Sequence, residues 1–165
     1  MSETVGIFSD LISQWEADFP GEDSTPVAIA MHLRHLHMLD QASLSEILMA
    51  FDVGIGEIDV LNYLRHQPAP HRLRPSDLAE LCMVTTGAIT GRIARLEQKG
   101  LVLRVPSSSD KRTVFVQMTD SGEKLLQASR IQVARSSRFL KGVRTLSASD
   151  RERLNLLLSK LISAF

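Results

Sequence analysis

The stretch TTGAITGRIARLEQKG, residues 85–100, predicts the helix around which the rest of the chain is organised. Its apolar residues Ile89, Ile93 and Leu96 recur at helical spacing and therefore form one inward stripe. Thr85 is of the residue type that caps helix N-termini, and Gly100 can adopt the left-handed conformation that ends many helices. We therefore predict a single helix here, with a polar and basic outer face.

The outer face of this helix has a composition suited to a DNA major groove. Thr86, Gly87 and Thr90 are small or carry hydroxyls, and Arg95 and Lys99 follow further along. Small side chains let a helix approach base edges, and cations meet the phosphates. An ordinary solvated amphipathic helix would show the same stripe, so this segment alone leaves both interpretations open.

The neighbouring segments favour the DNA-binding interpretation. Residues 75–83 predict a short helix with Pro75 at its first position, and Leu73 and Leu78 are spaced for a hydrophobic staple. Residues 101–118 contain two predicted strands, LVLRV and TVFVQM, joined by the loop PSSSDKR. Helix, tight turn, helix and hairpin is the order of elements in a winged helix-turn-helix.

At this point the sequence resembles the MarR family of bacterial transcription regulators. The resemblance rests on LRPSDLAELCMVTTGAITGRIARLEQKGLVLRVPSSSDKRTVFVQMTDSGEKLL, with its LEQKGLV helix exit and its Asp110-Lys111-Arg112 wing signature, and extends over residues 55–126. It implies a mainly α fold with a small β-hairpin wing. It also implies N-terminal helices for dimerisation and a pocket (1–53), a winged helix-turn-helix region (54–119) and C-terminal dimerisation helices (120–165).

Charge is segregated along the chain although its formal net value is zero. Residues 1–64 hold one basic residue against eleven acids, whereas residues 65–112 and 113–165 each hold nine Lys and Arg against four Asp and Glu. The basic excess thus lies where a phosphate backbone would need it. The partner we expect is double-stranded DNA.

The flanking segments are predicted to be helical and rich in apolar residues. Residues 5–19 form an amphipathic pattern that includes Trp15, and residues 20–26 form a linker. A second helix is predicted over about 27–51, with an interruption near Ser43 as one possibility. A third is predicted over 56–66, followed by a loop over 67–74. After the hairpin, Asp120 and Glu123 resemble a capping box that opens a long helix to about Val143. A last helix starts at Ser147.

These terminal helices carry more apolar surface than one winged-helix domain can cover, which indicates a homodimer. The family resemblance implies that the helices of two subunits interlock. Two-fold symmetry would then hold two recognition helices about 34 Å apart, one turn of B-DNA, and predicts a pseudo-palindromic operator.

The composition indicates a soluble cytoplasmic protein without catalytic chemistry. No apolar run approaches the ~18 residues of a membrane span, and there is no signal peptide pattern. The single cysteine excludes an internal disulfide. Since the sequence holds no glycine-rich phosphate loop, nucleophile elbow or usefully spaced pair of carboxylates, we expect no enzyme and no cofactor or metal site.

Seven residues are predicted to contact DNA. Arg112 would enter the minor groove at the wing, with Asp110 orienting it, because a narrow A·T tract concentrates negative potential there. Lys111, beside it, would meet phosphate or remain solvated. The other five lie on the recognition helix or at its cap, near base edges or phosphates: Thr85, Thr86, Gly87, Thr90 and Arg95.

Arg92 falls beside the apolar stripe rather than opposite it. An inward arginine keeps its charge and therefore requires an acid or an anionic ligand. Asp59, on the preceding helix, is an equally awkward carboxylate, and Arg104 is a further cation near the same junction. One interpretation is a partly buried salt bridge that sets helix packing.

The second interpretation comes from resemblance to the urate-responsive subgroup of the family, the HucR and PecS type. Trp15, Asp59, Arg92 and Arg104 match the four ligand-pocket positions of that subgroup, although Trp15 aligns only after gaps. The resemblance implies that Trp15 stacks on or hydrogen-bonds a purine anion and that Arg92 binds its anionic side. It also implies that Asp59 repels or positions the ligand and that Arg104 relays the change to the recognition helix. Gly91 departs from the subgroup's polar residue and puts the fine ligand preference in doubt.

Three other ligand responses remain open. An arginine in an apolar pocket suits any flat anion, including phenolic or other aromatic carboxylates. A metal sensor would use His32, His35 and His37, but on a helix the third points away from the first two. An oxidant sensor would use Cys82, which occupies an apolar position of the helix-turn-helix.

Overall fold

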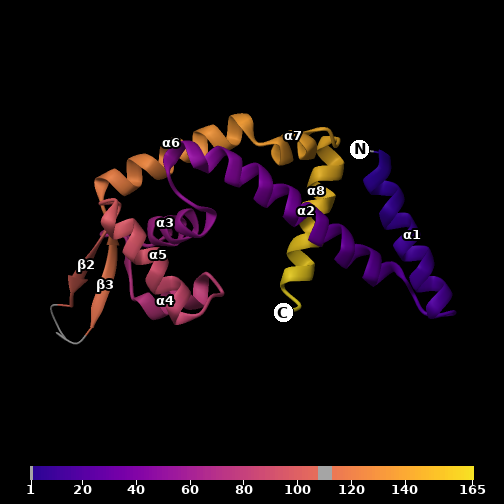
Figure 1. Cartoon of the computed structure of the whole chain (residues 1–165), viewed down its shortest axis with the longest axis horizontal. Coiled ribbons are helices and arrows are strands. Elements are labelled where there is room, and N and C mark those ends of the chain that lie inside the picture. Colours follow the sequence, from indigo (N-terminus) through magenta and orange to yellow (C-terminus); the bar gives the residue numbers. More distant parts are fainter. Residues whose placement is uncertain (1, 108–112) are drawn as a thin grey trace. The chain divides into compact units, whose positions relative to one another are not determined.

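The computed structural model describes residues 2–107 and 113–165, with side chains from residue 10 onward in these ranges. The chain divides into two compact units, Met1–Ala42 and Ser43–Phe165, and helix α2 (Thr25–Leu48) runs through the boundary. Among the described residues, no helix has the length and apolar character that crossing a membrane requires. Figure 1 shows the elements in chain order.

The first unit consists of α1 (Ser2–Asp18) and the first part of α2. The turn between them carries Gly21 at φ 93°, a conformation that favours glycine. Ser24 donates a hydrogen bond to Glu16 Oε1 (2.7 Å), and the backbone N–H of Thr25 donates to Asp23 Oδ1 (2.9 Å), so the turn is held by its own side chains. The predicted helix, linker and second helix are confirmed.

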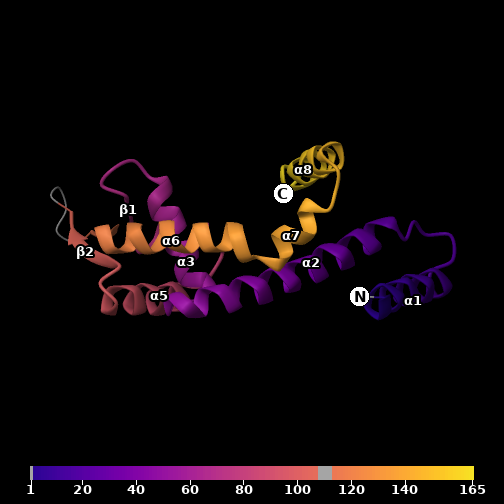
Figure 2. The same cartoon turned by 90° about the horizontal axis from the view of Figure 1, so that it is seen from above.

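The second unit is the winged helix-turn-helix with its C-terminal helices, as Figure 2 shows from above. A three-stranded antiparallel sheet of order β1-β3-β2 forms the wing, with Leu103 opposite Gln117. The elements after α2 are η1 (Met49–Phe51), α3 (Ile55–His66), β1 (Arg72–Leu73), α4 (Pro75–Leu81), α5 (Thr86–Gln98), β2 (Val102–Pro106), β3 (Val114–Met118), α6 (Asp120–Ser136), α7 (Arg138–Arg144) and α8 (Ala148–Ile162).

The core of this unit is the predicted apolar stripe and what packs on it. Ile89, Ile93 and Leu96 of α5 are completely buried, together with Leu61 of α3 and Leu78 of α4. Gly122 lets α6 approach closely, because a Cβ there would overlap the carbonyl oxygen of Leu101. The core therefore fixes α5 against α3, α4 and the base of the wing.

Both ends of α5 are built as predicted. Thr85 Oγ1 accepts a hydrogen bond from the backbone N–H of Ala88 (3.3 Å). Gly100 has φ 68°, and the N–H groups of Gly100 and Leu101 donate to the carbonyls of Glu97 and Leu96, both at 2.9 Å. This paired arrangement is a Schellman motif, which needs a left-handed residue at the glycine position.

Four sequence-based expectations need correction. Thr119, not Asp120, caps α6, because its Oγ1 accepts from the N–H of Gly122 (3.1 Å). The helix stops at Ser136 rather than Val143, because Ser137 caps a separate helix, α7, through the N–H of Leu140 (3.1 Å). The short α4 ends at Leu81, and strand β1 lies in a segment that we expected to be a loop.

The expected interruption at Ser43 is also absent from the structure. Helix α2 continues to Leu48 and is followed by the 3-10 turn η1. Ser43 is buried because its hydroxyl serves α7: it donates to Ser137 Oγ (3.2 Å) and accepts from the backbone N–H of Arg138 (3.0 Å). A serine in a helix interior is stable here because its hydroxyl has two partners.

Candidate functional site

The N-terminal face of α5 is the best candidate for contact with nucleic acid. Thr86, Gly87 and Thr90 are all exposed. A Cβ added to Gly87 would meet nothing within 4 Å. The Thr90 hydroxyl donates to the carbonyl of Thr86 (2.7 Å), which leaves its oxygen able to accept a further hydrogen bond. Since the opposite side of α5 is locked in the core, this face is presented rigidly to whatever approaches it.

Arg95, predicted to contact DNA, already has a partner in the protein. Its Nε lies 2.5 Å from Oε1 of Glu57, a side chain of α3 with only 5% of its surface exposed. Lys99, one turn further, lies 3.3 Å from Asp52 Oδ2 and 3.9 Å from Glu57 Oε2. The C-terminal part of α5 is therefore tied by charge to the start of α3.

The wing is anchored to the recognition helix by a second ion pair. Nε of Arg104 in β2 lies 3.1 Å from Oε2 of Glu97 in α5. Arg72 of β1 lies over the ring of Phe115 in β3, 4.8 Å from its centroid, a cation–π geometry. The wing-tip residues Asp110, Lys111 and Arg112 lie outside the described residues, so their roles stay predictions.

The structure brings Asp59 and Arg92 into one half-buried cluster. Arg92 of α5 reaches over Gly56 of α3, where a Cβ would overlap its guanidinium, and its Nη1 lies 3.5 Å from the Gly56 carbonyl. Burial raises the pKa of the Asp59 carboxyl above its ordinary 3.8, against a smaller lowering by the charge of Arg92. Asp59 and Arg92 therefore lie close enough, between α3 and α5, for their charges to interact.

Cys82 belongs to the same cluster. Burial raises the pKa of its thiol, and the carboxylate of Asp59 raises it further, while Arg92 opposes both. A thiol with a raised pKa holds less thiolate and is a poorer nucleophile. This environment agrees with the interpretation of Cys82 as a small apolar residue of the helix-turn-helix.

The other two residues of the predicted pocket are placed differently. Arg104 pairs with Glu97, as described above, and not with Asp59. Trp15 lies in the first unit, where its ring packs on Phe19 with centroids 4.6 Å apart. Its part in a pocket with Asp59 and Arg92 therefore stays a prediction. Across the described residues, no group of three or more His, Cys, Asp or Glu side chains is arranged to hold a metal ion.

Sequence reasoning missed Gly56 and Glu57 as functional candidates. Gly56 lies three residues before Asp59, so both lie on the side of α3 that faces Arg92. Glu57 lies three residues after Gly54 and accepts a hydrogen bond from its N–H (3.0 Å), a helix-capping pattern that is visible in the sequence. What the pattern does not reveal is that the second oxygen of Glu57 binds an arginine.

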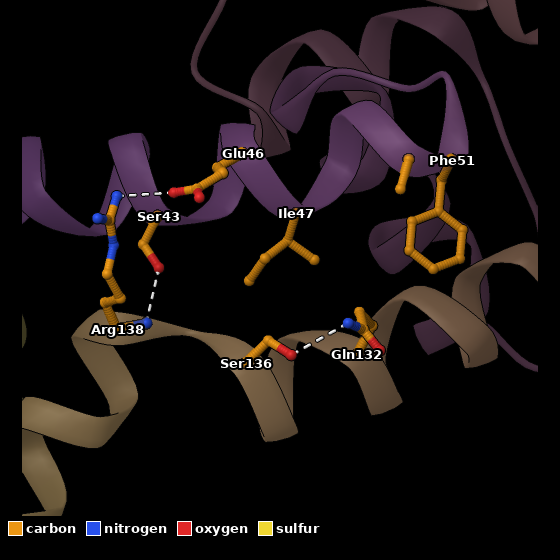
Figure 3. A pocket seen from close by; sticks show the side chains of 8 residues that line it. Ser43, Glu46, Ile47, Phe51, Gln132, Ser136 and Arg138 are labelled. Atoms are coloured by element: carbon orange, nitrogen blue, oxygen red, sulfur yellow. Dashed lines mark hydrogen bonds and ion pairs between the residues drawn. The ribbon is translucent and has the colours of Figure 1, made fainter.

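A groove of about 350 Å³ lies between the end of α2 and the junction of α6 with α7 (Figure 3). Ile47, Ala50 and Phe51 supply its apolar side. Its polar side chains are bonded to one another: Arg138 pairs with Glu46 (2.7 Å), and Gln132 donates to Ser136 (3.0 Å). A polar ligand would have to compete with these bonds.

The chain is similar to known proteins in both sequence and structure. A model of the MarR family matches residues 53–114. The transcriptional regulator PecS of Dickeya dadantii strain 3937 is 31% identical over 118 residues, which are 72% of this chain and 71% of PecS. The multiple antibiotic resistance protein MarR of Escherichia coli strain K12 is 29% identical over 132 residues, 78% of this chain and 89% of that protein.

Among solved structures, a mutant MarR from E. coli complexed with operator DNA is similar at a TM-score of 0.71 and 25% sequence identity. The similarity covers 85% of this chain and 99% of that one. Wild-type E. coli MarR in its apo form matches at a TM-score of 0.69 and 26% identity, over 80% of this chain and 94% of that chain.

Proposed function

Because the chain belongs to the MarR family, we propose that it is a sequence-specific regulator of transcription that binds double-stranded DNA. The observation that carries this proposal is the exposed Thr86, Gly87 and Thr90 face on a helix whose other side is completely buried. The similarity to a MarR complexed with operator DNA supports the same function. Such a protein acts where the chromosome lies, in the cytoplasm, and we assign it no catalytic step.

We assign the base and phosphate contacts to the start of α5 and to the wing. Thr86, Gly87 and Thr90 would approach base edges or nearby phosphates, and Thr85, whose hydroxyl already caps the helix, would add a backbone contact. Lys111 and Arg112 would reach phosphate and the minor groove. We assign Arg95 differently, because its guanidinium already pairs with Glu57.

The second copy needed for a palindromic site is suggested by α8. Leu154, Leu157 and Leu161 of this helix are between 40% and 55% exposed within the described chain. Burying such a stripe against a second copy would remove apolar surface from water and produce a two-fold dimer. Two recognition helices about 34 Å apart would then read a pseudo-palindromic operator.

DNA binding can be tested by selecting duplexes from a random library with the full-length protein and measuring affinity for the winner by fluorescence anisotropy. We expect an inverted repeat with half-site centres one helical turn apart. Thr90→Ala should weaken binding to this operator, whereas Gln127→Ala, an exposed polar change on α6, should leave it unchanged. Failure to enrich any sequence at low salt would contradict the function.

A small anionic ligand is proposed to release the protein from DNA, which would make it a repressor. The half-buried cluster of Arg92 and Asp59 supports this, because anion binding would draw the arginine away from the carboxylate and tilt α5. The ligand shifts the protein only as far as it prefers the state that does not bind DNA, and a coupling of ~1–3 kcal/mol is enough for a switch.

Urate or a related purine is our first choice of ligand, on the strength of the resemblance at Trp15, Asp59, Arg92 and Arg104. The alternative is a phenolic or other aromatic carboxylate, since an arginine beside apolar residues binds any flat anion. Metal and oxidant responses rank below these. Thermal shifts with urate and with a panel of aromatic acids separate the two main candidates.

The decisive experiment titrates urate, xanthine and hypoxanthine against the operator complex. Wild type should release DNA, while Trp15→Phe and Arg92→Ala should respond weakly. Arg130→Ala is the matched control, because Arg130 also reaches α3, at Asn62 Oδ1 (2.6 Å), but lies outside the cluster. If wild type ignores all three purines, the ligand proposal is wrong while DNA binding stands.

A further inference from the structure

The two flanks of α5 differ in what they face. An α-helix turns about 100° per residue, so Arg95 lies roughly 140° round the helix from Thr90. Arg95 and Lys99, four residues apart, share the flank that faces α3, and both carry ion-pair partners there. The exposed threonines occupy the other flank. Helix geometry therefore places Arg95 on a different flank of α5 from the two threonines proposed to read DNA.

Glu57 is the group on which this second flank depends. Its carboxylate is 5% exposed and uses both oxygens: Oε2 accepts from the backbone N–H of Gly54 (3.0 Å), and Oε1 accepts from Arg95 Nε (2.5 Å). The first bond fixes the carboxylate to the start of α3, and the second ties it to α5. One buried acid thus joins the two helices.

Moving Arg95 to a phosphate would leave that acid without its nearest cation. A buried carboxylate that loses its counter-charge is strongly destabilised, whereas an exposed contact with phosphate recovers little in water and salt. Lys99 cannot take the place of Arg95 without moving, because it lies 3.9 Å from Glu57 Oε2 and also binds the carbonyl oxygen of Asp52. We therefore expect Arg95 to stay paired with Glu57 when the protein binds DNA.

We propose that Glu57 is a positioning residue for DNA recognition, which acts through Arg95 to set the register of α5 on α3. Arg95 is an anchor in this scheme and not a contact to DNA. The inference rests on the proposed DNA-binding function and deepens it. It predicts that a variant without the Glu57–Arg95 pair has a lower affinity for the operator, because α5 no longer fits the base edges. The affinity for a duplex of any sequence, which depends on charge, should stay the same.

The test compares affinity for the selected operator and for a scrambled duplex of the same length over a series of salt concentrations. Full-length wild type, Arg95→Ala, Glu57→Gln and the double variant are measured, with Arg130→Ala as a control for the loss of one arginine from the surface. Glutamine keeps an acceptor for the N–H of Gly54 but removes the charge that holds Arg95. Circular dichroism confirms that each variant is folded.

We expect Arg95→Ala to keep the wild-type salt slope and affinity for the scrambled duplex, while preference for the operator falls roughly tenfold. Glu57→Gln should do the same, and the double variant should be no worse than either single one. If either single variant does not fold, the double variant decides, since it removes both charges and leaves no buried carboxylate without its cation.

Two results overturn the inference while the proposed function survives. One is a salt slope that falls by about one in Arg95→Ala but not in Arg130→Ala, because that change marks a lost phosphate contact. The other is additive effects of the two single variants, because independent residues add. Wild type that fails to distinguish operator from scrambled duplex would instead overturn the proposed function, and this inference with it.

Discussion

Helices α5 and α8 have the same amphipathic pattern in sequence and opposite fates in the structure. The apolar stripe of α5 (Ile89, Ile93 and Leu96) is completely buried. In α8, Leu157 is 55% exposed and Leu161 41%. Both helices begin with a hydroxyl cap, Thr85 for α5 and Ser147 for α8. Local sequence therefore forms both helices equally well.

The two helices differ in whether their own chain covers the apolar stripe. Helix α5 packs within its own chain, against α3, α4 and β2, so its position is determined by a single copy. Helix α8 has apolar surface left over, and burial of such surface drives association. We therefore propose that α5 reads DNA and that α8 joins two copies of the chain.

The largest effect should come from truncating the buried stripe. Ile93→Ala removes atoms from a fully buried site and leaves a cavity, so we expect the free energy of unfolding to fall by about 2–5 kcal/mol. Urea denaturation followed by circular dichroism measures it. A loss below that of an exposed apolar truncation such as Met83→Ala would mean that the α5 stripe is not the core.

The second-largest effect on stability should come from the close approach of α6 to Leu101, which lies shortly after the end of α5. In Gly122→Ala the new methyl group would overlap the carbonyl oxygen of Leu101, which is backbone and cannot swing aside. We expect a loss of about 1–3 kcal/mol from overpacking. Gly142→Ala in α7 is the control, because nothing lies within 4 Å of its Cβ position. Equal stability of both variants would contradict this packing.

Truncating α8 should act on assembly. Leu157→Ala is expected to raise the dimer dissociation constant by roughly tenfold, about 1.4 kcal/mol, through lost apolar burial. Analytical ultracentrifugation over a dilution series measures the constant. Met83→Ala is the control, because Met83 is an exposed apolar residue in a turn outside α8. A dissociation constant unchanged by Leu157→Ala would remove α8 from the interface.

A smaller effect distinguishes the contribution of α5 to stability from its contact with DNA. Gly87→Ala places a methyl group in open space, so we expect stability to rise by about 0.5–1 kcal/mol, as for Gly142→Ala. Only Gly87→Ala should weaken binding to the operator, because its methyl group would come between the helix and the base edges. If operator affinity is the same in both variants, Gly87 does not face DNA.

The smallest effect is the pH dependence set by Asp59. Burial raises its pKa, so the folded protein binds this proton more tightly than the unfolded chain does. The contribution of Asp59 to the free energy of unfolding should therefore fall as the pH rises from about 3.8, the ordinary value, through the raised folded value. Asp59→Asn lacks this loss, so its stability relative to wild type should increase over that window in urea melts. A constant difference would show that the pKa is not raised.

Much of the fold could be predicted because it rests on short-range rules. The caps at Thr85 and Ser147, the left-handed Gly100 and the first-turn Pro75 each follow from the chemistry of one residue. Errors arose where a residue served a distant partner. An interruption of the second helix near Ser43 was one possibility, but the hydroxyl of Ser43 binds Ser137, which is 94 residues away, and the helix continues.

The candidate site was predicted in its composition more than in its pairing. The spacing in the sequence marked Arg92 and Asp59 as charges that need a partner, and in the structure they lie close enough for their charges to interact. It could not reveal that Glu57 holds Arg95 or that Glu97 holds Arg104, because these pairs depend on how α3 and β2 pack on α5.

The order of residues by itself determined most of the helices, both ends of α5 and the separation of a hydroxyl face from an apolar stripe on that helix. These follow from backbone sterics and hydrogen bonding within a few residues. Only the tertiary structure decided which arginines form ion pairs within the protein and which apolar stripe remains exposed. A charge chooses its partner by distance and burial, and those are properties of packed helices.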